Sequence, residues 1–392
     1  MGWKRKDRLP LRSATDVQWS SGYDRRINKR RFRAMLSVLH TTSNVRLLSL
    51  YYADINVTQQ AIIFGISTLR TLEVHSCRFD PSTKPLPVSR INSLICGHTD
   101  LQTIRRLLTL LATTVESLRV LDHDGTIGDT LQGGLIELPK LSSLTIQEDA
   151  FAILGTTNQY KSITTLRIVF EYHSPKVSFH HTDFPALRNV TCDQDLAVSL
   201  IPQRPVTTYV EVRSTRKEAG REMFLNALSK TRAKITNLKL FVPLKFYSLL
   251  SSLATSLHHL EQLTLGCRNH DPGWLKRYAQ YGQRPINTPG AVVATLPKLK
   301  RITCWVVDYM STKLLFEEVV KTWVIPLCPA LEVYECLTWP CTPDFEDDRL
   351  PEPTRAWKVR RLPDGSWERQ GPPPIPTPVP ANELSVVHFA SF

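Results

Sequence analysis

The stretch LPKLSSLTIQ, residues 138–147, contains the pattern that decides the fold. Its apolar residues Leu141, Leu144 and Ile146 follow the order L-x-x-L-x-L, which we call the anchor pattern. The pattern recurs about a dozen times, for example as LPKLKRITC at 296–304 and FPALRNVTC at 184–192. Because successive residues of a strand point to opposite faces, each recurrence predicts a short strand whose second and third anchors point to the same side.

The spacing of these predicted strands is regular. The middle anchors lie between 20 and 28 residues apart at Leu48, Leu72, Leu94, Leu118, Leu144, Leu166, Val190, Val210, Leu238 and Leu263. Intervals of about 20 to 29 residues are typical of leucine-rich repeats. Two further units, at Ile302 and Tyr334, follow at longer intervals, which indicates insertions, the first around 271–290.

Segments with helical periodicity separate the strands. They lie at 58–67, 100–113, 217–231, 243–256 and 311–323. A strand, a return helix and a parallel strand one repeat later bury apolar surface only against neighbouring repeats. The sequence therefore predicts an α/β leucine-rich-repeat solenoid, with parallel strands on the concave face and helices on the convex face.

Four regions follow from these patterns. Residues 1–27 are basic and without sustained periodicity, and we predict them to be mostly disordered. We place the repeat array, of about twelve irregular units, at 28–341. An acidic loop and a β-hairpin around the turn Pro363-Asp364-Gly365 are predicted for 342–370. The tail at 371–392 carries GPPPIPTPVP and is predicted to be extended polyproline II.

The formal net charge of +13 is concentrated at the amino terminus, where the first 33 residues hold eleven Lys or Arg against three Asp. This excess fits a nuclear localisation patch, a contact with nucleic acid or a solvated tail. The chain holds no run of about 18 apolar residues, so no membrane span is predicted. No apolar signal segment follows the basic start, which favours a cytoplasmic or nuclear location.

The cysteines fit buried positions of the repeats. Four of the eight, Cys96, Cys192, Cys304 and Cys336, stand at the third anchor, where we predict buried thiols. A metal site would need Cys328, Cys336 and Cys341 or the histidine pairs at 180–181 and 258–259, and none of these has zinc-ligand spacing. No cofactor or metal is predicted.

Catalytic motifs are missing from the sequence. It contains no G-x-S-x-G elbow, no phosphate-binding G-x-x-x-x-G-K-[ST], no G-x-G-x-x-G and no H-E-x-x-H. We therefore predict that the protein is not an enzyme.

The residues between the anchors point away from the core and are the candidates for binding. The position between the second and third anchors is polar in eleven of twelve units. Aromatic and Arg side chains are the types that most often dominate protein interfaces. We predict a protein-binding surface from six residues, with Trp305 either exposed or covered by the insertion at 271–290: Arg119, Arg167, Lys239, Phe241, Arg301 and Trp305.

The cysteine-tolerant repeats, the segment FPALRNVTCDQDLAVSLIPQRPVTTYVEV at 184–212 and the hairpin at 357–367 resemble the fungal F-box and leucine-rich-repeat-like proteins. The resemblance covers residues 32–369. It implies an intracellular substrate receptor, in which an F-box docks on the Skp1 adaptor of a cullin-RING ubiquitin ligase and the repeats hold a protein substrate.

The F-box itself is not recognisable. Leu9-Pro10 is present, but the following LRSATDVQWSSGYDRRINKRR has no sustained apolar face. Skp1 and cullin are therefore expected as partners only if an F-box lies upstream, and a repeat-only relative is the other expectation. The sequence predicts a non-enzymatic protein-binding scaffold for a substrate of unknown identity, with a nucleic-acid-associated protein and, after it, an enzyme as the alternatives.

Overall fold

The computed structural model describes residues 15–20, 32–39, 44–81, 87, 89–121, 137–147, 161–169, 179–180, 182–211, 218–241, 253, 256–266, 296–306, 328–338 and 355–370. The predictions for the helix at 311–323, most of the helix at 243–256, the acidic loop and the proline-rich tail lie outside these residues. The chain divides into an N-terminal unit, Met1–Phe241 with Ser248–Leu260, and a C-terminal unit, Val242–Tyr247 with Glu261–Phe392.

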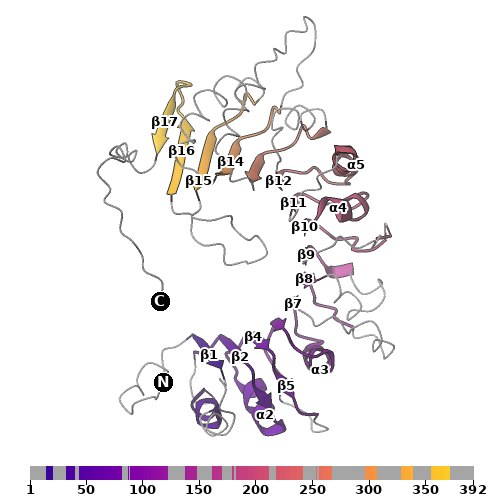
Figure 1. The fold of residues 1–392 in the computed structure, drawn as a ribbon, viewed down its shortest axis with the longest axis vertical. Helices are drawn as coiled ribbons and strands as arrows, with labels where there is room; N and C mark the ends of the chain where they lie inside the picture. The colour runs from indigo at the N-terminus through magenta and orange to yellow at the C-terminus, as the bar shows by residue number, and fades with distance from the viewer. Residues whose placement is uncertain are drawn as a thin grey trace, which may run out of the picture. The chain divides into compact units, whose positions relative to one another are not determined.

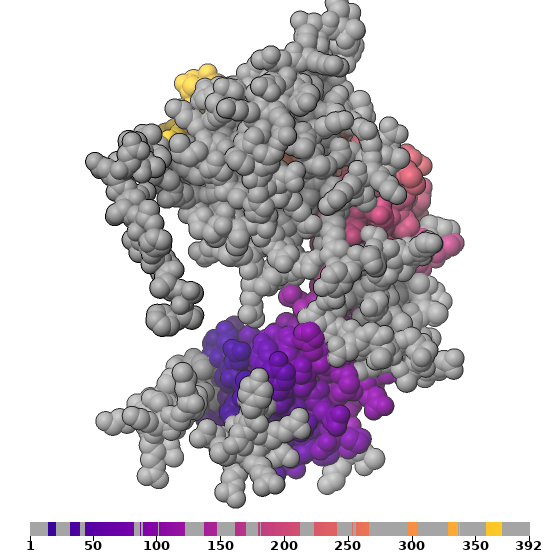
Figure 2. Space-filling model, in the orientation of Figure 1, coloured from indigo at the N-terminus to yellow at the C-terminus, as the bar shows by residue number. Residues whose placement is uncertain are grey.

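The N-terminal unit is built on a parallel sheet whose strands follow the chain in order (Figure 1). The strands are β1 (Asp16–Ser20), β2 (Leu47–Tyr51), β4 (Thr71–His75), β6 (Ser93–Gly97), β7 (Ser117–Leu121), β8 (Ser143–Gln147), β9 (Thr165–Val169), β10 (Asn189–Cys192), β11 (Thr208–Glu211) and β12 (Asn237–Phe241). A second, small parallel sheet pairs β3 (Asp54–Ile55) with β5 (Arg78–Phe79). In the space-filling view, the described residues from β2 to α3 form one continuous block, coloured indigo to purple (Figure 2).

Helices connect several of these strands and lie on one side of the sheet (Figure 1). They are α2 (Val57–Gly65), α3 (Leu101–Leu111), α4 (Gln194–Leu200) and α5 (Glu218–Ser229). Asn56 forms a capping box with Gln59 at the start of α2, and the Asp100 carboxylate accepts the Thr103 N–H at the start of α3. Such caps satisfy backbone donors that a helix leaves unpaired. The periodicity at 58–67, 100–113 and 217–231 thus predicted α2, α3 and α5 to within a few residues.

One backbone hydrogen-bond arrangement repeats where the strands begin. The carbonyl of Arg46, just before β2, accepts the N–H groups of Arg70 and Thr71, both at 2.9 Å. The carbonyls of Arg70, Asn92, Glu116, Ser142, Thr164, Arg188 and Thr207 accept an equivalent pair from the next strand. This shared pairing holds consecutive strands in the same register.

The same arrangement extends the sheet to β1, in a part of the chain that we predicted to be disordered. The Thr15 carbonyl accepts the N–H groups of Arg46 and Leu47, and β1 pairs in parallel with β2. Val17 is buried. The ring centroid of Trp19 lies 5.4 Å from that of Phe32, which belongs to the helical residues 32–39. Five residues are too few to show periodicity in a polar segment, so only this packing reveals the strand.

The alternation predicted for the central strands is confirmed. Leu144, Leu166 and Leu238 are fully buried, as are Ile146 and Ile168. The polar residues between the anchors in β8, β9 and β12 are half-buried on the opposite face. A shift of one residue would exchange the two faces, so the buried set fixes the register of each strand.

In β11 the sequence-based register was wrong by one residue. We placed Val210 in the core and Glu211 outside, but β10 and β11 pair Val190 with Tyr209 and Cys192 with Glu211. Tyr209 and Glu211 are both fully buried. The Tyr209 hydroxyl donates to the Cys192 carbonyl at 2.9 Å, which satisfies a buried polar group and favours the aromatic residue over Val210 in the core.

The C-terminal unit contains β13 (Gln262–Gly266), β14 (Arg301–Val306) and β15 (Val333–Thr338), which pair in parallel. β16 (Arg355–Arg361) pairs antiparallel with β15, and β17 (Trp367–Gln370) pairs antiparallel with β16. Between β16 and β17, Gly365 has a φ of 85° and the Asp364 carboxylate accepts the Ser366 N–H at 2.8 Å. The described chain is therefore an α/β protein with long, mostly parallel β-structure.

The thiols whose side chains are described are buried and free. They are Cys77, Cys96, Cys192 and Cys328. Burial raises the pKa of Cys77 to about 11 and of Cys328 to about 12, so these thiols are protonated at neutral pH. The side chains of Cys304 and Cys336 lie outside the described residues. Within the described part of the chain, no group of three or more His, Cys, Asp or Glu side chains is placed to hold a metal ion.

Candidate binding surface on the strand face

The face of the N-terminal sheet that points away from the buried anchors carries two aligned rows of side chains. The first outward row runs through Leu47, Thr71, Ser93, Ser117, Ser143, Thr165, Asn189, Thr208 and Asn237. The second outward row runs through Ser49, Glu73, Ile95, Arg119, Thr145, Arg167, Thr191, Val210 and Lys239. Their alignment follows from the strand register.

Three of the six predicted binding residues share the second row. We call Arg119, Arg167 and Lys239 the basic row; they stand on β7, β9 and β12 and are half-buried. The residues between them in the register are short and uncharged: Thr145, Thr191 and Val210. The structure thus places three cationic side chains along one face.

The other three predicted residues stand outside the basic row. Phe241 ends β12, and its side chain lies outside the described residues. Arg301 is exposed at the start of β14 in the C-terminal unit. Trp305 pairs with Gly266 and Leu337 in that unit, and its side chain is also outside the described residues, so its predicted exposure stays a prediction.

Lys239 of the basic row stands in an unfavourable electrostatic environment. Burial, and then the positive charge of Arg167, lower the pKa of the Lys239 ammonium to about 8. The protonated form is disfavoured because desolvation and a like charge both oppose it. A negative group brought to this position would stabilise the charged form.

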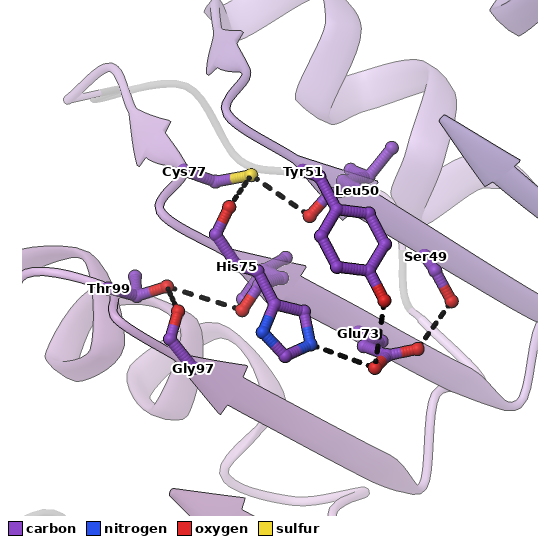
Figure 3. A network of polar contacts seen from close by, with 9 residues as sticks. Ser49, Leu50, Tyr51, Glu73, His75, Cys77, Gly97 and Thr99 are labelled. Atoms are coloured by element: carbon purple, nitrogen blue, oxygen red, sulfur yellow. Dashed lines mark hydrogen bonds and ion pairs between the residues drawn. The ribbon is translucent and has the colours of Figure 1, made fainter. Parts of the chain in front are cut away.

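A polar cluster occupies the β2 and β4 end of the same face (Figure 3). Ser49 donates to Glu73 Oε2 at 2.5 Å, and Tyr51 donates to Glu73 Oε1 at 3.3 Å. The Nε2 atom of His75 lies 2.8 Å from the same Oε1 atom. We call these four residues the Glu73 cluster. They surround both oxygens of a carboxylate whose side chain is 12% exposed.

The His75 ring is confined from two sides. Its plane stacks on the Tyr51 ring, with centroids 4.7 Å apart and 5° between the planes. On the other side it lies over Gly97 of β6, where an added Cβ atom would stand 2.3 Å from His75 Nδ1. Only glycine leaves room for this ring position, so Gly97 helps to aim Nε2 at Glu73 (Figure 3).

The strand ends beside the cluster are fixed by a repeated bend. Tyr52, Ser76 and His98 each follow a strand and have φ values of 56°, 49° and 46°. Each donates its N–H to the end of the next strand, as Tyr52 does to the His75 carbonyl at 2.9 Å. Thr99, which follows His98, donates its hydroxyl to the Val74 carbonyl at 3.2 Å. These bonds offset the strain of left-handed backbone at non-glycine residues.

The Glu73 cluster does not form an activated nucleophile. Ser49 and His75 both contact the carboxylate, so the imidazole does not stand between acid and hydroxyl as in a catalytic triad. Burial raises the pKa of Glu73, but the hydrogen bonds from Ser49 and His75 outweigh it and lower the pKa overall. Such a carboxylate is a weak base at neutral pH. The ionised Glu73 stabilises the folded state fully at a pH above the ordinary pKa of Glu. This stabilisation is lost as the pH falls through the lowered pKa of Glu73.

The sequence contained the members of the cluster but not their grouping. Ser49, Glu73, Tyr51 and His75 all stand at outward positions between or after the anchors. Only the register that pairs Ser49 with Glu73 and Tyr51 with His75 brings them together.

Gly97→Ala should lower the free energy of unfolding by about 1 to 3 kcal/mol, because the methyl group overlaps the His75 ring. Urea unfolding of the full chain measures this change. In the background of His75→Ala, the same substitution should cost much less, because the clashing ring is gone. An equal cost in both backgrounds would show that the His75 ring does not set the space above Gly97.

Comparison with known proteins adds no assignment: no protein-family model matches the chain, and no curated protein matches it significantly. The function is therefore inferred from the geometry of the strand face.

None of the helices among the described residues combines the length and apolar character needed to span a membrane.

Proposed function

We propose that the chain is a leucine-rich-repeat protein that binds another protein, without catalysing a reaction, through the strand face of its N-terminal unit. The observation that carries the proposal is the basic row: Arg119, Arg167 and Lys239 in register on one face. Half-buried Arg and Lys side chains on a rigid sheet lose little freedom on binding, which favours recognition.

The repeat class is supported by more than the spacing of anchors. The consensus L-x-x-L-x-L-x-x-[N/C]-x-L of this class fits Leu69, Leu72, Val74, Cys77 and Phe79, all of which are buried. Cys77 donates to the Leu50 carbonyl of the preceding repeat at 3.3 Å, and Thr99 has the corresponding role one repeat later. A helix or short turn on one side and parallel strands on the other agree with a solenoid of repeats.

Site-specific photo-crosslinking of the full chain in cells tests the binding face. A photoreactive residue at Asn189, exposed in the first outward row, should capture a discrete protein that excess unlabelled chain competes away. The matched position is Met223 of α5, which is 58% exposed on the helix side and should not capture that protein. Capture of the same protein from both positions, or of nucleic acid alone from Asn189, would refute the proposal.

A role as a substrate receptor of a cullin-RING ubiquitin ligase rests on the resemblance to fungal F-box proteins. It predicts that the protein captured at Asn189 becomes more abundant when the gene for the chain is deleted, because its ubiquitination stops. Co-purification with Skp1 separates a receptor from a repeat-only binding protein. An unchanged abundance of the captured protein would remove the ligase role and leave the binding role in place.

A further inference from the structure

We infer that the strand face from β7 to β12 binds an extended, acidic protein segment lying across the strands, with its carboxylates at the basic row. The inference rests on the proposed protein-binding function and adds the chemical class of the partner. It follows from three features of the two outward rows: their charge, their spacing and their lack of aromatic residues.

The charged residues of the two outward rows between β7 and β12 have one sign. Between β7 and β12, the second outward row holds the basic row and three short uncharged residues. The first outward row holds only hydroxyl and amide side chains: Ser117, Ser143, Thr165, Asn189, Thr208 and Asn237. No acidic residue stands in either row over these strands. Surfaces of one charge favour partners of the opposite charge and reject like-charged ones.

The spacing of the basic row fits an extended peptide. Arg119 and Arg167 are two strands apart, and Arg167 and Lys239 are three strands apart. With strands about 4.8 Å apart, these separations are about 10 and 14 Å along the row. An extended chain advances about 3.4 Å per residue, so alternate acidic residues, whose side chains share one face, stand about 7 Å apart and bring a carboxylate within about 4 Å of each cation along the row.

The first outward row supplies what the backbone of such a peptide needs. Its short polar side chains stand two residues before the second outward row on the same strands and offer both donors and acceptors. Asn189 and Thr165 are already bonded to each other at 3.1 Å, which shows that neighbouring members of the row reach one another. A peptide crossing the strands would thus find hydrogen-bonding groups at each step.

Nucleic acid fits this surface less well. Proteins that hold single strands combine a basic groove with aromatic side chains on which bases stack. Neither outward row carries an aromatic residue between β7 and β12. Aromatic residues of the face stand one outward position beyond the second row, at Tyr51, His75 and Phe241. His75 is engaged with Glu73, and the side chain of Phe241 lies outside the described residues.

Fluorescence anisotropy with the full chain tests the inference. The probe is a labelled peptide of glycine and serine with glutamates at its first, third, fifth, seventh and ninth positions, at pH 7 and low salt. It should bind at least about tenfold tighter than the same peptide with glutamine at those positions, and the affinity should fall as salt screens the charges. Equal binding of the two peptides would overturn the inference.

Lys239→Met separates binding from folding. The variant should weaken the acidic peptide about tenfold, because one cation of the row is lost. Its unfolding midpoint at pH 7 should stay equal or rise, because methionine carries no charge to desolvate at this half-buried position. The control Lys230→Met removes an exposed lysine outside the rows and should leave affinity unchanged. Unchanged affinity in Lys239→Met, or equal loss in both variants, contradicts the inference.

The pH dependence gives an independent readout. Between pH 7 and 9.5 the affinity of the native chain for the acidic peptide should fall as Lys239, whose pKa is about 8, loses its proton. Stability should move the other way over the same range, because the unfolded chain keeps this proton up to an ordinary Lys pKa near 10.5 and therefore binds more protons. The positive charge of Arg167 acts on Lys239, and its register partner Val210 is uncharged. The affinity of Lys239→Met should not show this fall.

The outcomes distinguish this inference from the function on which it rests. A protein captured at Asn189 together with no binding of the acidic peptide would reject the acidic partner and keep the binding face. A single-stranded RNA that binds more tightly than the acidic peptide and is weakened by Lys239→Met would assign the row to nucleic acid and overturn the inference. Absence of both capture and peptide binding would reject the two proposals together.

Discussion

Arg204→Met should lower the free energy of unfolding of the N-terminal unit by about 3 to 5 kcal/mol, the cost of removing one partner from a buried charged network. Arg204 is fully buried. Its Nε atom donates to the Asp183 carbonyl at 2.6 Å, and Nη2 donates to the His180 carbonyl at 2.5 Å. Nη1 donates to the Leu200 carbonyl at 2.7 Å, at the end of α4.

The guanidinium therefore joins two parts of the chain: the backbone at His180 and Asp183, and the end of α4. Burial lowers the pKa of Arg204, so the charge is costly in this position and is held by its carbonyl partners. Methionine fills similar volume but leaves those carbonyls without their donor. The stabilisation lost with these hydrogen bonds should exceed the stabilisation gained by removing a buried charge.

Chemical denaturation of the full chain measures the change, and hydrogen exchange at α4 and β11 localises it. Arg188→Met removes an exposed arginine nearby and should change stability by less than about 0.5 kcal/mol. Arg204→Lys should recover only part of the stability, because an ammonium group cannot reproduce the planar fork of donors. Native stability in Arg204→Met would mean that the carbonyls find other donors.

Leu166→Ala should cost about 2 to 5 kcal/mol, because the truncation leaves a cavity in a packed core. Leu166 is fully buried at the centre of β9. It stands in register with Leu144 of β8 and Val190 of β10, which are also buried. Strands held on both sides leave little room for the core to collapse around the missing methyl groups.

The control for Leu166 is its neighbour on the other face. Thr165 is half-buried in the first outward row, and Thr165→Ala should cost about 1 kcal/mol or less, because only the contact with Asn189 is lost. Urea unfolding of both variants measures the contrast. Similar costs for the two substitutions would contradict the assignment of the faces.

The repeated strands and several helices follow from sequence alone because their signals are local. Alternation over five residues marked β8 and β9, and helical periodicity marked α2 and α3. Cys96 and Cys192 were placed correctly because a small, weakly polar side chain fits an anchor position. The members of the basic row were also predicted one by one, as outward positions of their strands.

Other features depend on contacts between distant residues. β1 has too little apolar content to stand out, and its pairing with β2 and the packing of Trp19 on Phe32 define it. In β11, local hydrophobicity favours Val210 in the core. Two contacts of Tyr209 decide the register instead: its hydroxyl donates to the Cys192 carbonyl, and its ring centroid lies 5.0 Å from that of Phe224.

The candidate site likewise has features that local sequence determines and features that depend on contacts between distant residues. The sequence by itself determined which residues leave the core, because alternation within one strand needs no partner. Only the tertiary structure decided that Arg119, Arg167 and Lys239 form one row and that Glu73 gathers Ser49 and His75. The register between strands that are 19 to 29 residues apart in the sequence sets which side chains meet. That register is fixed by the buried anchors and by the shared backbone hydrogen bonds before each strand.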